Sequence, residues 1–88
     1  FERDILLSDL RQHVCEIFFK DNSGKQLAVR CSLRHDVLPE SYSLTEEEKE
    51  REFHAKNPEI LSAWDIMNSG WKQFHINSIT YIQIIDTF

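Results

Sequence analysis

The hydrophobic positions along the chain follow two different periods. In residues 4–12, near the N-terminus, Ile5, Leu6 and Leu10 fall on one side of a helix. This spacing predicts a short amphipathic helix, and we expect it to close one end of the core. The residues that follow alternate between apolar and polar side chains, which is the period of a strand with one buried face.

Two alternating segments, residues 13–20 and 26–33, predict a pair of strands. The side chains expected to face the core are Cys15, Ile17 and Phe19 in the first segment, and Leu27, Val29, Cys31 and Leu33 in the second. Phe18 breaks the pattern because it falls on the polar face, and Ser32 is expected to point to solvent. Residues 21–25 contain turn-forming side chains and a glycine, so the two strands are predicted to form a hairpin.

The alternation stops over residues 34–62, which we interpret as a helical insertion. The sequence SLTE at residues 43–46 fits a capping box and predicts a helix over residues 44–55. An Asn-Pro pair ends this helix, and a second short helical turn is expected over residues 58–62. The apolar side chains that the first helix offers to the core are Leu44, Phe53 and Ala55. Its outer face is therefore expected to be solvated.

Three further strands are predicted over residues 63–68, 71–76 and 79–85, with tight turns between them. In the middle one, Phe74 and Ile76 are expected to face the core, and Trp71, Gln73 and His75 the opposite side. The last strand is nearly all apolar, so it is either covered on both faces or an edge that awaits a partner, and a homodimer is one hypothesis. Five short antiparallel strands with short helices indicate a mainly β fold, most simply a small barrel.

The composition is that of one globular domain over residues 1–88. Hydrophobic side chains make up 41% and charged side chains 28% of the 88 residues. No apolar run approaches the ~20 residues that span a bilayer, and the first residues lack the features of a signal peptide. We therefore expect a soluble protein with no membrane contact.

The net charge of −5 is concentrated in one segment. Residues 40–59 contain seven acidic and three basic side chains, so the rest of the chain is close to neutral. A uniformly basic footprint for nucleic acid is absent, and we expect nucleic-acid binding to be weak at most. The acidic run is either a solvated helix face or a surface that docks on a basic patch of another protein. The candidate partner-binding residues are Glu46, Glu47 and Glu50.

The cysteines and histidines do not form a recognisable metal or redox motif. Cys15 and Cys31 are expected to be buried free thiols in a reducing compartment. A zinc site made with His13 and His35 is the alternative, but no Cys-x-x-Cys spacing supports it. We therefore expect no metal and no cofactor.

Candidate catalytic groups are few. Cys31 with His35 is one conceivable pair, although a thiol on the inward face of a strand is usually inert. Asp65 and His75 are another, because they could approach each other across the predicted hairpin as a surface pair. No serine has a nucleophile-elbow context and no phosphate-binding loop is present. The sequence favours a protein that is not an enzyme.

Two blocks of the sequence resemble a known family. Residues 14–33, VCEIFFKDNSGKQLAVRCSL, and residues 64–79, WDIMNSGWKQFHINSI, are similar to a family of small tailed-phage proteins related to WYL domains. The resemblance implies a five-stranded SH3-like (Sm-like) half-open barrel. It also implies a phage protein, such as an early protein of host takeover, that is made in the host cell cytoplasm.

The resemblance also points to candidate ligand residues. WYL domains sense ligands through polar and basic residues near the segment that corresponds here to Trp71, Lys72 and Phe74. Lys72 stands where an arginine is usual, so a bidentate anion contact is not available at that position. The candidates for binding a ligand or nucleic acid are Trp71, Lys72, Gln73, His75 and Arg30. Alternatively, Trp71 only covers a gap at the end of the barrel.

A binding role is the function that these features favour. A small phage protein without catalytic groups is expected to act on a host bacterial protein, and this expectation rests on analogy with the family. Binding of nucleic acid or a small ligand, as a WYL-type regulator, is the alternative.

Overall fold

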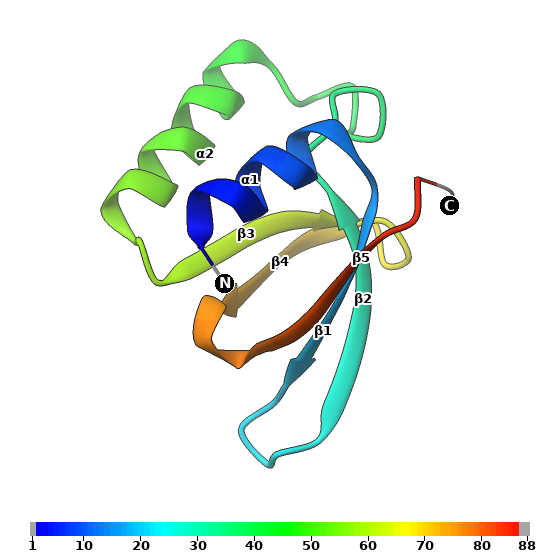
Figure 1. Ribbon diagram of the computed structural model, residues 1–88. Coiled ribbons are helices and arrows are strands. Elements are labelled where there is room, and N and C mark those ends of the chain that lie inside the picture. The colour runs from blue at the N-terminus through cyan, green and yellow to red at the C-terminus, as the bar shows by residue number, and fades with distance from the viewer. Residues whose placement is uncertain (1, 87–88) are drawn as a thin grey trace.

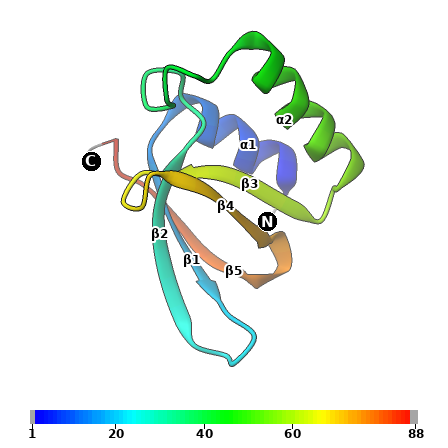
Figure 2. The ribbon, with the colours of Figure 1, turned by 180° about the vertical axis from the view of Figure 1, so that it is seen from behind.

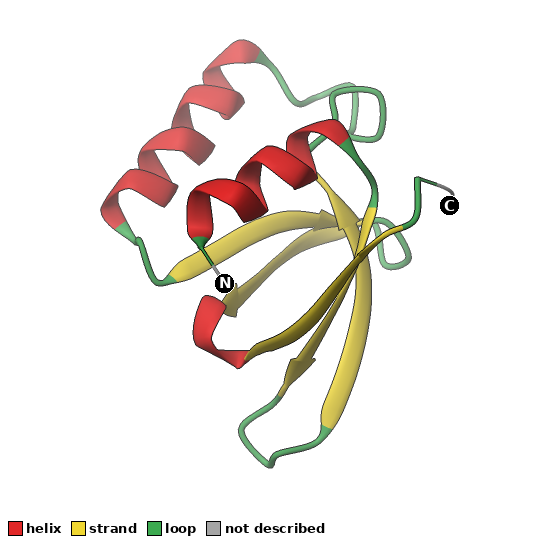
Figure 3. Cartoon of the chain, in the orientation of Figure 1, coloured by secondary structure: helices red, strands yellow, loops and turns green. Residues whose placement is uncertain are grey.

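The chain folds into one open five-stranded antiparallel sheet with two helices (Figures 1 and 3). The computed structural model describes residues 2–86. The elements in chain order are α1 (Arg3–Gln12), β1 (Cys15–Lys20), β2 (Gln26–Ser32), α2 (Leu44–Lys56), β3 (Ile60–Asp65), β4 (Gly70–His75), a 3-10 turn (Ile76–Ser78) and β5 (Ile79–Ile84). The strand order is β4-β3-β2-β1-β5, so β4 and β5 are the two edges.

The sheet bends strongly at β2. The first half of this strand pairs only with β1. Its last two residues pair with β3, Cys31 with Asp65 and Ser32 with Trp64. The bend brings β4 back toward β1, since the ring centroids of Phe19 and Phe74 lie 5.3 Å apart although their strands are not neighbours. The core fills the concave side, with both helices at one end of the sheet and the β1–β2 turn at the other (Figure 2).

The predicted hairpin of β1 and β2 is confirmed. The expected inward residues Cys15, Ile17, Phe19, Val29, Cys31 and Leu33 are buried, and Leu27 is half-buried. Asp21 fixes the turn by accepting hydrogen bonds from the amides of Ser23 and Lys25. Ser32 was expected to face solvent, and this is wrong, because its hydroxyl is buried and donates to backbone carbonyls at the end of α1.

The predicted N-terminal helix is also confirmed, with one correction. Leu6 and Leu10 of α1 are buried in the core, and the amide of Leu33 donates to the carbonyl of Leu10. Ile5 was expected on the same buried side but is 58% exposed. It lies one position before Leu6, about 100° around the helix, and this turns it from the core toward β5.

The acidic helix forms where predicted, but its buried face was predicted wrongly. The hydroxyl of Ser43 accepts from the amide of Glu46, which is one of the two hydrogen bonds of the predicted capping box. Of the apolar side chains expected in the core, Leu44 and Ala55 are exposed and Phe53 is half-buried. The residues that α2 buries are Glu50 and His54. Polar side chains are buried here because α1 and β3 supply hydrogen-bond partners for them.

The third strand begins earlier than the sequence suggested. β3 starts at Ile60, so the helical turn expected over residues 58–62 is wrong. The strand ends at Asp65, whose carboxylate accepts from the amides of Met67 and Asn68 and thereby closes the turn to β4. The earlier start lengthens the pairing of β3 with β4, which runs without interruption from Ile60 to Asp65.

Candidate functional site

An open groove of about 400 Å³ runs between α1 and the edge strand β5. Its lining includes Glu2 just before α1, Ile5 and Asp9 from α1, and Tyr81, Ile82 and Ile84 from β5. The helix residues recur at the spacing of one helix face, and the strand contributes four consecutive residues. None of these residues was predicted as a site from the sequence. The signal that could have found them was the unbroken apolar run of β5.

The groove exposes apolar surface that a monomer would usually bury. Ile5 is 58%, Tyr81 56% and Ile84 47% exposed. Ile82 is half-buried and packs against the core. On the outer side of the sheet Tyr81 also contacts Phe18, with ring centroids 5.6 Å apart, and this explains why an aromatic side chain stands on the polar face of β1. Contiguous exposed apolar groups of this kind mark interaction surfaces.

The helix wall of the groove is acidic. Glu2 and Asp9 line it, and neither carboxylate forms an ion pair with any residue between positions 2 and 86. The arginines of α1 are engaged elsewhere, since Arg3 donates to the carbonyl of His54 at 2.8 Å and Arg11 binds Glu50. Within residues 2–86, no basic group therefore pairs with the two carboxylates at the groove.

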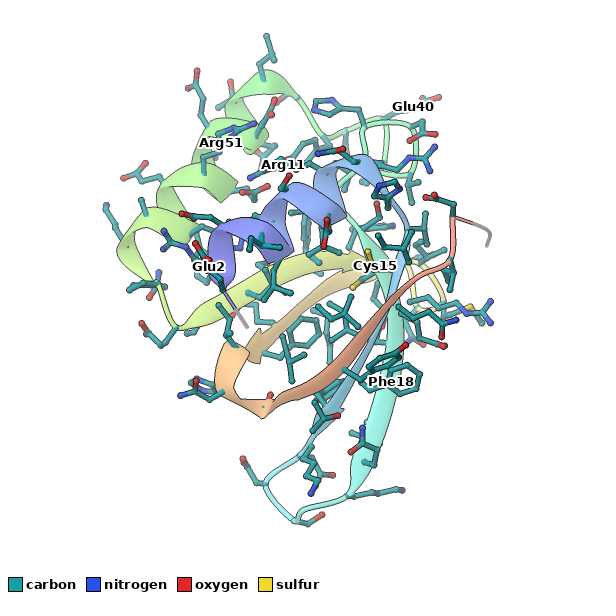
Figure 4. All side chains as sticks on the ribbon, viewed as in Figure 1. Glu2, Arg11, Cys15, Phe18, Glu40 and Arg51 are labelled. Carbon is teal, nitrogen blue, oxygen red and sulfur yellow. The ribbon has the colours of Figure 1, made fainter. Side chains whose placement is uncertain are left out.

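A buried polar cluster joins the two helices to the sheet. Arg11 donates two hydrogen bonds to the Glu50 carboxylate, at 2.7 and 2.9 Å, and lies between the helices (Figure 4). His54 Nε2 accepts from the amide of Ser62 at 3.0 Å, so the proton is on Nδ1, which donates to Glu50 Oε2 at 2.8 Å. Burial by itself would raise the pKa of Glu50, but the hydrogen bonds from His54 and Arg11 outweigh it and lower the pKa to about 2.

The three acidic candidates for partner binding therefore differ in their availability. Glu50 is buried in the polar cluster, with only 6% of its side chain exposed. Glu47 is largely covered and pairs with Arg51 at 3.0 Å. Glu46 is exposed and lies 3.6 Å from Lys49. Bases along the same helix thus offset much of the charge that the sequence concentrates here.

Trp71 belongs to a row of aromatic side chains on the outside of the sheet. Its ring centroid lies 5.5 Å from that of Trp64, its pairing partner on β3, and 5.7 Å from that of Tyr42. His35 stands at the edge of Tyr42, with a centroid distance of 6.1 Å. Burial and the carboxylates of Glu50 and Glu47 raise the pKa of Tyr42 to about 12, so its hydroxyl stays neutral.

The other ligand candidates fall into two places. Lys72, Gln73 and His75 line a pocket of about 190 Å³ at the free edge of β4, together with Lys20. The ammonium group of Lys72 lies 5.6 Å from the centre of the Phe19 ring, a cation–π distance. Arg30 is not part of this pocket, because it lies on β2 and pairs with Glu16 at 3.5 Å.

The expected buried free thiols are confirmed. Cys15 and Cys31 are opposite each other on β1 and β2, and both are buried and unoxidised. Burial raises the pKa of Cys15 to about 11 and that of Cys31 further, so both stay protonated. His35 is exposed and does not join Cys31 in a catalytic pair.

The proposed approach of Asp65 to His75 is wrong. Asp65 pairs with Gly70 and His75 with Ile60, at opposite ends of the β3–β4 hairpin. Among residues 2–86, no three histidine, cysteine, aspartate or glutamate side chains gather in a way that could hold a metal ion. Over the same range, no helix has the length and apolar character needed to cross a membrane.

Comparison with protein-family models, with curated proteins and with solved structures found no match to this chain, so the candidate site is argued from its geometry.

Proposed function

We propose that this protein is a non-catalytic binding module that holds another protein in the groove between α1 and β5. The observation that carries the proposal is the exposure of Ile5 and Ile84 in one groove at a sheet edge, with Tyr81 exposed on the other face of the same edge strand. Burying such groups on a partner is favourable by about 25 cal/mol per Å² of apolar surface removed from water. The protonated, buried thiols are consistent with a binding role, since they offer no activated nucleophile.

The sequence resemblance suggests the type of fold, the source of the protein and the kind of partner. Residues 14–33 form the β1–β2 hairpin, and residues 64–79 cover the end of β3, the whole of β4 and the start of β5, so the matching blocks fall largely on the sheet. The order β4-β3-β2-β1-β5 and the bend at β2 support an SH3-like (Sm-like) half-open barrel. On this basis the protein is a small tailed-phage accessory protein of the host cytoplasm, and its partner is a host bacterial protein.

A pull-down from nuclease-treated bacterial lysate tests the proposal. The wild-type protein is compared with Ile5→Glu, which places a charge in the groove at an exposed position. Leu44→Glu is the matched control, because Leu44 is 75% exposed on α2, away from the groove. We expect wild type and Leu44→Glu to retain the same protein and Ile5→Glu to lose it. Equal retention by Ile5→Glu would place the binding surface elsewhere.

A second candidate is the binding of a small anion or a nucleic-acid strand at the edge of β4. The pocket there brings Lys20 and Lys72 together beside the Phe19 ring, and it contains three of the five predicted ligand residues, Lys72, Gln73 and His75. Asp21 lines the same pocket and opposes an anion. The same pull-down without nuclease tests this candidate. It predicts that the wild-type protein and Ile5→Glu capture nucleic acid and that Lys72→Gln does not.

A further inference from the structure

The outer edge of β5 presents unused backbone hydrogen-bonding groups. The amide of Ile85 donates to the carbonyl of Val14, next to β1, at 2.9 Å. Successive residues of a strand direct their amide and carbonyl groups to opposite sides, so those of Ile84 and Ile82 point away from β1. Because β5 is the last strand of the sheet, these groups have no strand partner among residues 2–86. The edge can therefore accept a further strand.

The side chains at this edge divide between two faces. Ile82 is paired with Ile17 and Ile84 with Cys15, and both partners face the core. Ile82 and Ile84 therefore point to the concave side, where α1 forms the wall of the groove. A strand added to β5 would place every second side chain in that groove.

We propose, on the basis of the binding function above, that the partner supplies an extended segment that adds to β5 as a sixth strand. This segment places an apolar side chain on Ile5 and a basic side chain on either side of it, facing Glu2 and Asp9. The strand runs antiparallel to β5, like every other pair in the sheet. The pattern recognised is basic, any, apolar, any, basic.

The spacing of the helix residues supports this pattern. Glu2 and Asp9 lie about 4.5 Å and about 6 Å along the helix axis from Ile5, at 1.5 Å per residue. Side chains on the same face of a strand are about 6.7 Å apart. When an apolar side chain covers Ile5, the long side chains two positions before and after it therefore reach the two carboxylates.

Charge favours a foreign segment over a second copy of this chain. Pairing β5 with itself would bring the Glu2 and Asp9 carboxylates of both copies to the same face of the joined sheet, and each chain has a net charge of −5. Like charges at an interface disfavour association. A basic segment is instead attracted by the Glu2 and Asp9 carboxylates, which repel a second copy of this chain.

The probe for this proposal is the peptide acetyl-Thr-Lys-Thr-Ile-Thr-Lys-Thr-amide. One control peptide has glutamate in place of both lysines, and a second carries an N-methyl group on the central isoleucine, which removes a donor facing β5. In a ¹⁵N NMR titration we expect the first peptide to shift the amides of Ile82 and Ile84. Both controls should bind roughly tenfold more weakly, since the loss of two exposed ion pairs, or of one strand hydrogen bond, is worth up to about that factor.

A charge variant of the protein supplies the matched test. Glu2→Gln combined with Asp9→Gln should bind the lysine and glutamate peptides equally, because the carboxylates that distinguish them are gone. Equal binding of the N-methylated peptide, or shifts confined to the Trp71 row, would overturn strand addition. A mass that doubles with concentration in light scattering, with Ile82 and Ile84 amides protected, would make a second copy the occupant instead.

The outcomes separate this inference from the proposed function. If the lysate partner is lost by Ile5→Glu but the peptide leaves Ile82 and Ile84 unshifted, the groove binds protein in another way and only the strand inference fails. If Ile5→Glu retains the partner and the peptide still binds at β5, the strand edge is functional and the proposed partner surface is wrong.

Discussion

Single side chains decide how α2 is attached. Glu50 accepts hydrogen bonds from Arg11 on α1 and from His54 on its own helix, in a buried site. We expect Glu50→Gln to lower the free energy of unfolding by roughly 1–3 kcal/mol, because Arg11 then lacks a counterion in a partly buried position. Urea unfolding measures the loss. Glu52→Gln is the control, since the Glu52–Lys56 pair is exposed and screened by solvent and should contribute little to stability. Similar losses in the two variants would contradict the role of the cluster.

The same carboxylate predicts a pH dependence. The pKa of Glu50 is lowered from 4.5 to about 2 in the folded protein, because hydrogen bonds from His54 and Arg11 overcome the opposing effect of burial. A lowered folded pKa contributes stability that is fully present above the unfolded value and is lost as the pH falls. We expect the free energy of unfolding to decrease from pH 4.5 toward pH 2, and this decrease to be smaller in Glu50→Gln. Unfolding curves across that range provide the test.

The two thiols give a check on strand register. Cys15 and Cys31 are buried opposite each other, and burial raises the pKa of Cys15 to about 11. Alkylation of the native protein at pH 8 should therefore be at least about a hundredfold slower than in denaturant, since the thiolate is the reacting form. Mass spectrometry of the labelled protein measures both rates. Equal rates would mean that neither thiol faces the core.

At the scale of elements, the orientation of α1 makes a prediction. Leu10 is 1% exposed and Ile5 58% exposed on the same helix. Leu10→Ala should lower the free energy of unfolding by about 2–4 kcal/mol, whereas Ile5→Ala should change it by less than about 0.5 kcal/mol. Chemical denaturation of both variants compares the two positions. A large loss in Ile5→Ala would place that side chain in the core.

Elements with a regular apolar period could be predicted from the sequence, and elements with polar contacts could not. Alternation correctly placed the inward residues of β1 and β2, together with Phe74 and Ile76. The buried face of α2 was missed, because Glu50 and His54 are buried through partners far away in the chain. The start of β3 was missed because Pro58 suggested a helical turn, and pairing with β4 overrides that local preference.

The candidate site was the least predictable part. Lys72, Gln73 and His75 do lie together, because neighbouring residues of one strand share a pocket at its edge. The groove has no local signature, since it forms where Ile5 and β5 meet from opposite ends of the chain. The apolar run of residues 79–85 predicted either a strand covered on both faces or an edge in need of a partner, and the strand order shows that β5 is an edge.

For the whole molecule, the charge distribution predicts weak binding to nucleic acid. The net charge is −5, and Arg30 is paired with Glu16 on the sheet surface. We expect single-stranded DNA to bind no more tightly than the ~10⁻⁴–10⁻⁶ M of non-specific contacts at physiological salt. Fluorescence anisotropy with a labelled oligonucleotide measures this. Sub-micromolar affinity would favour the β4-edge pocket as the working site.

The contrast between the core and the α2 attachment has a thermal consequence. The sheet is held by apolar contacts, whose strength fades on cooling because exposing them to water carries a positive heat capacity. The link from α2 to α1 and β3 is made of charged and hydrogen-bonded groups, and exposing polar groups changes the heat capacity in the opposite direction. Cooling therefore weakens the sheet relative to the helix attachment.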